Sequence, residues 1–157
     1  MEFDEKLIKL GLTIPQAPAK GGAYEPAKAF GENLYYLSGC GPNLNRDGAV
    51  VYAGVLGREY DVEAGRQAAR CCVLNLLAVF LRDVGDFFKI KSIVKMIAFV
   101  ACTDDFYDQP KVADGASLLL AELFGSEAGR PARSAVGTNA LPNNFPVEIE
   151  LLIEVFP

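Results

Sequence analysis

The sequence predicts an α+β fold, a mixed β-sheet with two helices packed on one of its faces. Apolar residues at helical spacing mark residues 61–85 and 110–124 as the two helices. The nearly continuous apolar run Ile93–Cys102 predicts a strand that is covered on both faces. Strict alternation over residues 147–156 predicts a last strand with two unlike faces. At 157 residues, the chain is the size of one domain built on a single core.

The N-terminal part of the chain predicts a short helix, a connector and a hairpin. Residues 4–11 place apolar side chains among charges and end in glycine, which is typical of a short amphipathic helix. Residues 14–22 contain two prolines and two glycines and should be irregular. Residues 27–30 and 34–38 are strand-like, and the turn 31–33 joins them.

The second arm of this hairpin runs into Ser38-Gly39-Cys40-Gly41-Pro42. Its two glycines would let the backbone come close to another group, although a plain loop would contain the same residues. After a polar turn, Ala49–Tyr52 predicts a third short strand. A connector then leads to the first long helix.

Both long helices have recognisable ends. Asp61 predicts the N-cap of the first and Gly85 its stop, while Pro110 opens the second and Gly125 ends it. The apolar stripe of the first helix comprises Ala69, Cys72, Val73, Leu76, Val79 and Phe80. The inward residues of the second are Val112, Ala116, Leu119, Leu120 and Leu123.

The last strand has one face for the helices and one face without a predicted cover. Val147, Ile149, Leu151, Ile153 and Val155 point one way, and Glu148, Glu150, Leu152, Glu154 and Phe156 point the other. Because both helices lie on the same side, the face that carries Leu152 and Phe156 needs another cover. Self-association in a closed cyclic oligomer would supply it.

Composition excludes several classes of function. The net charge of −5 and the scattered lysines and arginines argue against a nucleic-acid partner. The absence of histidine excludes Ser-His-Asp and Cys-His nucleophiles and histidine-ligated metals, so proton transfer would fall to Glu, Asp, Tyr, Lys or water. The four cysteines form no CxxC pair and predict reduced, packed thiols. With no leader pattern and no membrane-spanning apolar run, we expect a cytoplasmic protein without a membrane partner.

Two charged residues near the C-terminus lie in apolar surroundings. Arg133 and Glu148 fall on what we expect to be neighbouring strands. Burying such charges costs free energy unless they are paired or serve a ligand. They are therefore candidate site residues, although a purely structural ion pair would have the same sequence.

Five short segments carry a resemblance to a known family: Tyr24, Leu37-Ser38-Gly39, Pro131-Ala132-Arg133-Ser134, Leu141-Pro142 and Val147-Glu148-Ile149-Glu150. They resemble the reactive-intermediate (enamine/imine) deaminase family, also called the YjgF/YER057c/UK114 or endoribonuclease L-PSP family. The resemblance covers residues 20–156, so we expect one such domain over 1–157 with residues 1–19 as an N-terminal extension. That extension and the loop 41–58 are longer than in compact members, which indicates a divergent subgroup.

The resemblance implies a chorismate-mutase-like fold assembled as a homotrimer with clefts between subunits. Active members hydrolyse small 2-imino and 2-enamino acids, such as 2-iminobutanoate and 2-iminopropanoate, to a 2-oxo acid and ammonia. They need no cofactor and no metal. The expected partners are thus a small carboxylate substrate and two further copies of the chain.

By position, the resemblance also implies roles for individual residues. Arg133 matches the arginine that binds the substrate carboxylate, and Glu148 matches a glutamate that holds the attacking water or moves a proton. A guanidinium beside Glu148 would keep that carboxyl ionised. Tyr24 matches an aromatic that closes over the ligand, and Ser38 with Gly39 matches a cleft wall. Tyr24 as a packing aromatic and Ser38 as a strand end are the plain alternatives.

Two departures from the family pattern bear on activity. Ala135 stands where active members carry cysteine, and Asp114 stands nearest to the family's asparagine on the second helix, where a carboxylate would repel an anionic substrate. The leading hypothesis is a hydrolytic deaminase that uses Arg133 and Glu148. A non-catalytic, trimeric small-carboxylate-binding or regulatory protein is the alternative, and RNA cleavage comes third because the chain is acidic and lacks histidine.

Overall fold

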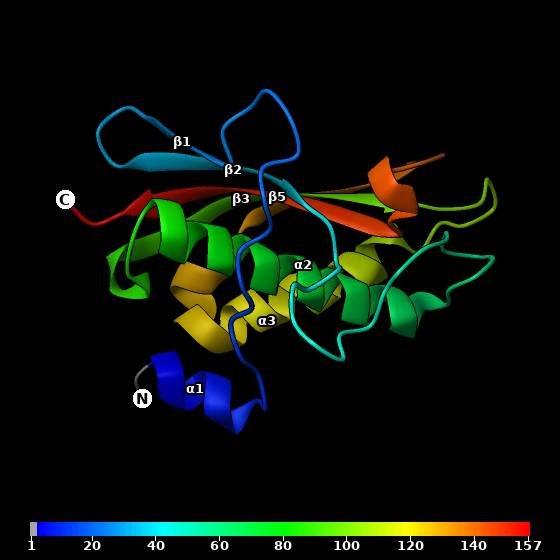
Figure 1. Cartoon of the computed structure of the whole chain (residues 1–157), viewed down its shortest axis with the longest axis horizontal. Coiled ribbons are helices and arrows are strands. Elements are labelled where there is room, and N and C mark those ends of the chain that lie inside the picture. Colours follow the sequence, from blue (N-terminus) through cyan, green and yellow to red (C-terminus); the bar gives the residue numbers. More distant parts are fainter. Residues whose placement is uncertain (1–2) are drawn as a thin grey trace.

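The computed structural model describes residues 3–157, and within them it contains one five-stranded sheet and three α-helices (Figure 1). In chain order the elements are α1 (Phe3–Lys9), β1 (Ala27–Phe30), β2 (Leu34–Cys40), α2 (Val62–Asp83), the 3-10 turn η1 (Phe87–Lys89), β3 (Ile90–Ala101), α3 (Gln109–Gly129), β4 (Ala132–Thr138), the 3-10 turn η2 (Pro142–Asn144) and β5 (Val147–Val155). The α+β class and the hairpin of β1 and β2 are as predicted.

The strands lie in the order β1-β2-β5-β3-β4. Only β3 and β4 pair in parallel, and the remaining pairs are antiparallel. The expectation that β4 and β5 are neighbours is wrong, because β3 lies between them and pairs with both. The chain crosses the end of β3 after β4, where the Ala101 amide donates to the Pro146 carbonyl at 2.9 Å.

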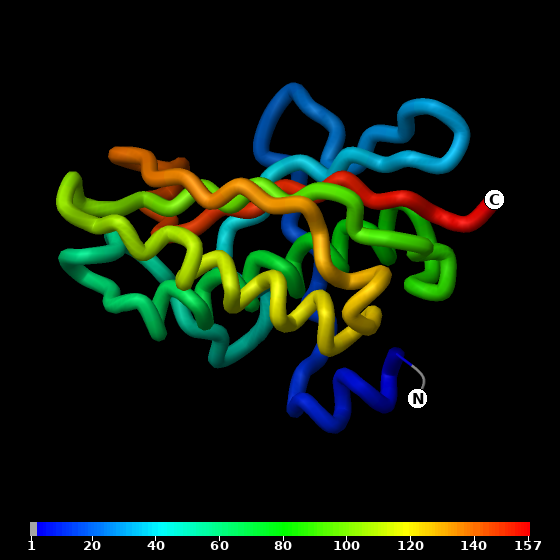
Figure 2. The backbone as a smooth tube through the Cα atoms, turned by 180° about the vertical axis from the view of Figure 1, so that it is seen from behind, coloured from blue at the N-terminus to red at the C-terminus, as the bar shows by residue number. Residues whose placement is uncertain are grey.

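Helices α2 and α3 cover one face of the sheet, and α1 packs beneath α3 (Figures 1 and 2). The alternating side chains of β5 show which face is covered. The odd-numbered residues from 147 to 155 are buried, whereas the even-numbered residues from 148 to 154 are half-buried. Met96, Ala98 and Val100 of β3 are completely buried on the helix side. The predicted stripes of both helices belong to this same core.

The predicted ends of the two long helices are largely confirmed. Asp61 caps α2, where its carboxylate accepts from the Ala64 amide at 2.8 Å. Gly125 breaks α3 with a φ of 85°, but the helix resumes for one more turn to Gly129. Lys6 of α1 donates to the Leu123 carbonyl at 2.6 Å, so a cation from the N-terminal helix satisfies a carbonyl that the break leaves open.

The predicted third strand at Ala49–Tyr52 is wrong, because this segment is an irregular loop. The Tyr52 amide donates to the Asn43 side chain at 2.7 Å and so is not free for a strand partner. Val50 and Val51 point into solvent, while the Tyr52 ring is buried. Only the Tyr52 side chain of this short apolar run is buried, and the run does not form a strand of the sheet.

The length and mean hydropathy of α2 would by themselves suffice to cross a bilayer, contrary to the expectation from the sequence. In the fold, 67% of its most apolar window is buried. The sheet and α3 thus account for the apolar composition of this helix.

The second face of the sheet carries no helix within residues 3–157 (Figure 1). Exposed aromatic and branched side chains lie on it, among them Phe30, Tyr36, Val136 and Phe156. The same face carries Glu148 and Glu150, because both alternate with the buried positions of β5. The predicted uncovered face is therefore present in the single chain.

Candidate functional site

A cavity of about 520 Å³ lies at the end of β2, between the sheet, α2 and the segment that precedes β1. Its wall comprises Pro18, Ala19, Gly21, Tyr24, Pro26, Ser38, Gly39, Cys40, Gly41, Asn43, Asn75, Val79, Pro142, Asn143, Phe145 and Glu148. Four of the residues predicted from the sequence, namely Tyr24, Ser38, Gly39 and Glu148, are together in this wall. Arg133 and Asp114 are not part of it.

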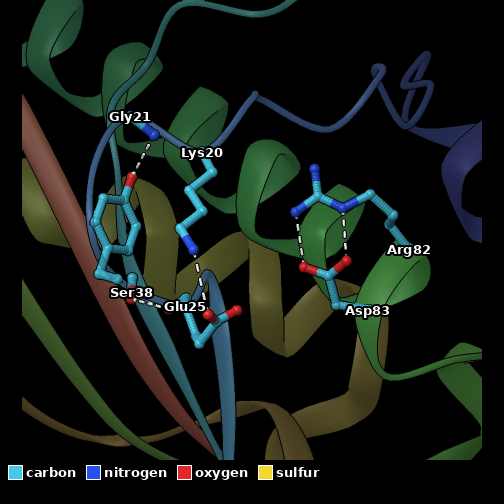
Figure 3. Close-up of polar contacts among 7 residues, drawn as sticks. Lys20, Gly21, Glu25, Ser38, Arg82 and Asp83 are labelled. Carbon is cyan, nitrogen blue, oxygen red and sulfur yellow. Dashed lines mark hydrogen bonds and ion pairs between the residues drawn. The ribbon is translucent and has the colours of Figure 1, made fainter.

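Hydrogen bonds shape the rim of the cavity at the hairpin side. The Ser38 hydroxyl donates to the Glu25 carbonyl at 2.6 Å, and the Gly21 amide donates to the Tyr24 hydroxyl at 3.1 Å (Figure 3). Lys20 forms an ion pair with the Glu25 carboxylate at 3.2 Å. Tyr24 is 44% exposed and therefore is not packed into the core, and the hydrogen bond to its hydroxyl holds it at the rim. This position suits an aromatic that contacts a ligand.

The rim is also anchored to the end of α2. Arg82 donates to the Pro18 carbonyl at 2.9 Å and holds both oxygens of Asp83 in a bidentate pair at 2.6 and 2.7 Å (Figure 3). Pro18 is itself part of the cavity wall. The N-terminal segment is therefore a fixed part of the site, which the sequence did not predict.

Gly39 is required where β2 passes Glu148. A Cβ atom built at position 39 would overlap the Glu148 carboxylate, so any larger residue would force this carboxylate to move. A β-bulge between Leu37 and Cys40 accompanies this contact. The interpretation of the glycine as a point of close approach is thus correct, and the group that approaches is the side chain of Glu148.

Glu148 is the chemically distinctive group of the cavity. Burial raises its pKa, and the negative charge of Glu150 two residues away raises it further. Within residues 3–157, Glu148 forms no ion pair and no side-chain hydrogen bond. The expectation that an adjacent guanidinium keeps it ionised is therefore wrong for the single chain.

Arg133 instead contacts α3. Its Nη1 donates to Asp114 Oδ1 at 2.7 Å and to the Ser117 hydroxyl at 3.2 Å. The Arg133 side chain is 24% exposed and that of Asp114 is 44% exposed, so the pair is open to solvent on one side. The residue opposite Arg133 is thus Asp114.

Arg133 and Glu148 cannot meet within one chain. Arg133 pairs in register with Met96 and faces the helices, whereas Glu148 pairs with Phe99 and faces the other way. Two strand spacings and three residues along β3 place their Cα atoms roughly 14 Å apart. The predicted Arg133–Glu148 pair is wrong, because the intervening strand and the opposite facing were not visible in the sequence.

Reasoning from the sequence also missed Asn75. This side chain on α2 is 2% exposed and donates to the Gly41 and Asn43 carbonyls at 3.0 Å each. It ties the end of β2 to α2 and so supports the cavity wall. A polar residue inside the apolar stripe was the available signal.

Cys40 lies in the wall but is poorly suited to act as a nucleophile. Burial raises the pKa of its thiol to about 12, and the nearby Glu148 acts in the same direction. Within residues 3–157, no three Cys, Asp or Glu side chains converge closely enough to hold a metal ion. The polar side-chain groups available for chemistry in the cavity wall are therefore carboxyl, amide and hydroxyl groups.

Comparison with known proteins identifies the family. The model of the YjgF/chorismate mutase-like family, whose description adds a provisional endoribonuclease role, matches residues 4–155. The chain belongs to this family. Protein TCP17 of Trypanosoma cruzi is 36% identical over 149 residues, which are 95% of this chain and 91% of TCP17.

Two solved structures match almost the whole chain. Atu1372 from Agrobacterium tumefaciens is 38% identical with a TM-score of 0.86, and the match covers 98% of this chain and 92% of Atu1372. A protein of Shewanella oneidensis that is provisionally called an endoribonuclease is 32% identical with a TM-score of 0.90, over 98% of this chain and 99% of its own. Because so little of the chain lies outside these matches, nearly all of the N-terminal segment is part of the fold shared with these two proteins.

Proposed function

We propose that the protein is a hydrolytic deaminase of small 2-imino and 2-enamino acids. The net reaction is R–C(=NH₂⁺)–COO⁻ + H₂O → R–CO–COO⁻ + NH₄⁺. The supporting observation is Glu148, a half-buried carboxyl of raised pKa that has no ion partner within residues 3–157 and lies in a cavity wall. A carboxyl in such surroundings is suited to exchange protons with water near neutral pH. Membership of the YjgF family supports a small-molecule ligand.

The proposed site is completed between subunits of a homotrimer. Within one chain the guanidinium of Arg133 lies on the helix side of the edge strand β4, far from Glu148. Association through the uncovered face, which exposes Tyr36 and Val136, would bury apolar surface and set the β4 edge of one subunit against the cavity of the next. Size-exclusion chromatography with light scattering should then report three chains of 16.9 kDa each.

Each residue then has a defined part in the reaction. Arg133 binds the carboxylate through its planar pair of donors, and Tyr24 at the rim contacts the bound ligand. The enamine tautomerises to the imine, and a water molecule at Glu148 gives up a proton as its oxygen attacks the imine carbon. Glu148 returns this proton to the nitrogen of the tetrahedral intermediate. As the C–N bond breaks, the hydroxyl gives its proton to Glu148, the carbonyl of the 2-oxo acid forms, and ammonia leaves. The proton on Glu148 then passes to ammonia, which gives ammonium.

The decisive experiment measures ammonia and pyruvate released from freshly generated 2-aminoacrylate. Arg133→Ala should lower the rate at least about a hundredfold, since two hydrogen bonds between charged groups are lost. Arg70→Ala is the matched control, because Arg70 is also 24% exposed and also pairs with an acid of α3. Equal rates for wild type and Arg133→Ala would refute the proposal.

A non-catalytic carboxylate-binding or regulatory role is the second candidate. The direct Arg133–Asp114 pair at 2.7 Å and the absence of a thiol at Ala135 favour it. Stabilisation by 2-oxo acids in a thermal-shift assay that depends on Arg133, without any release of ammonia, would establish this function in place of the first.

A further inference from the structure

The Arg133–Asp114 pair presents two opposite charges side by side at the surface of the sheet edge. Only Nη1 of Arg133 is used, in bonds to Asp114 and Ser117, and within residues 3–157 its Nε and Nη2 donate to no group. Asp114 uses only Oδ1 for Arg133, and 44% of its side chain is exposed. Each partner therefore keeps a free edge that can contact a ligand.

The free edges have opposite requirements. The Nε–Nη2 edge of Arg133 matches the two oxygens of a carboxylate. Oδ2 of Asp114 accepts from an N–H donor, preferably a cationic one, and repels an anion. A ligand that carries only a carboxylate gains at Arg133 and loses at Asp114, whereas a ligand with a carboxylate and an adjacent cationic nitrogen gains at both.

We propose that Asp114 makes this site selective for zwitterions, so that it binds the protonated 2-imino acid and related α-amino acids in preference to the 2-oxo acid. The inference rests on the proposed function and adds the charge state of its substrate. Asp114 would contact the iminium nitrogen while Arg133 holds the carboxylate. Because hydrolysis replaces the iminium by a carbonyl oxygen, the product no longer satisfies Asp114 and leaves.

The test compares the binding of L-alanine, a stable zwitterion, with that of pyruvate by isothermal titration calorimetry. Wild type should bind L-alanine at least about tenfold more tightly than pyruvate, since one unfavourable and one favourable charge contact distinguish them. Asp114→Asn should reduce this ratio by about tenfold and bind pyruvate more tightly. Arg133→Ala should lose both ligands.

Glu122→Gln is the control, since Glu122 lies on the same helix, is 48% exposed and pairs with Arg70 rather than Arg133. It should leave the ratio unchanged. Circular dichroism and thermal unfolding verify that each variant folds, and Asp114→Ser provides a second removal of the charge. Product inhibition by pyruvate should also strengthen in both Asp114 variants.

The two proposals fail in different ways. Zwitterion selectivity is overturned if wild type binds pyruvate as tightly as L-alanine, or if it binds neither ligand. It is also overturned if the ratio of the two affinities does not change in the Asp114 variants. If one of these results is found and ammonia is still released in a manner that depends on Arg133, the deaminase function holds without zwitterion selectivity. If no ammonia is released while the charge preference holds, deamination fails and the zwitterion site remains.

Discussion

Asp114 and Glu148 are both carboxylates near the sheet, yet their surroundings differ. Asp114 on α3 has a guanidinium at 2.7 Å and is 44% exposed. Glu148 on β5 is half-buried next to Gly39, has no cation partner within residues 3–157, and its pKa is raised by burial and by Glu150. The first carboxylate is therefore paired with a cation, while the second is suited to take up and release a proton.

The difference shows how one sheet can separate ligand binding from proton transfer. Asp114 lies on α3 beside Arg133, which is on the helix side of β4, whereas Glu148 lies on the opposite face of β5. Strand β3 separates β4 from β5, so neither carboxylate perturbs the other within one chain. Had Arg133 been next to Glu148, the pKa of Glu148 would have been lowered and its use as a general base near neutral pH reduced.

Glu148→Gln should have the largest effect on turnover. The amide is nearly isosteric but exchanges no proton, so the rate of ammonia release should fall by about 10²- to 10⁴-fold while L-alanine still binds. Glu154→Gln is the control on the same strand and face, because Glu154 pairs with Lys91 at 2.8 Å away from the cavity. A normal rate in Glu148→Gln would remove this residue from the mechanism.

Gly39→Ala should have the next largest effect. The added Cβ overlaps the Glu148 carboxylate and must displace it, so we expect turnover to fall by about tenfold or more, in line with the sensitivity of catalysis to small displacements. Gly48→Ala is the control for backbone strain alone, since Gly48 has a φ of 70° and nothing within 4 Å of an added Cβ. Steady-state kinetics would contradict the prediction if both variants lost activity equally.

The stability of Glu148→Gln should depend on pH in a defined direction. Near the ordinary pKa of about 4.5 and below, both proteins carry a neutral group at this position and should differ little. As the pH rises through the raised pKa of Glu148, wild type must ionise a half-buried carboxyl and loses stability relative to the variant. Melting temperatures between pH 4 and pH 8 should therefore diverge in favour of Glu148→Gln, and parallel curves would contradict the assigned shift.

Ala135→Cys should have the smallest effect. Ala135 lies on the same face of β4 as Arg133 and packs against the core, away from Glu148 and the cavity. We expect turnover within about twofold of wild type, since the proposed chemistry uses a carboxyl and water. A large gain in rate would contradict this prediction and show that a thiol at position 135 takes part in the chemistry.

Local patterns in the sequence determined the elements and their faces. Asp61, Gly125 and the alternation of residues 147–155 predict a helix start, a helix break and a two-faced strand, because capping, φ angle and pleat act over a few residues. The segments with Tyr24, Ser38, Gly39 and Glu148, which the resemblance grouped together, line one cavity.

Which charged side chains meet depends on the strand order. Strand order depends on long-range pairing, so the position of β3 between β4 and β5 could not be read from a connection of a few residues. Because β3 lies between β4 and β5, Arg133 pairs with Asp114, and Glu148 lies beside Gly39 without a cation partner in the described residues. The interaction between two charges depends on their distance in space, and burial determines the free energy needed to ionise a side chain. The cavity wall from Pro18 and the tie through Asn75 likewise join segments that are distant in the chain.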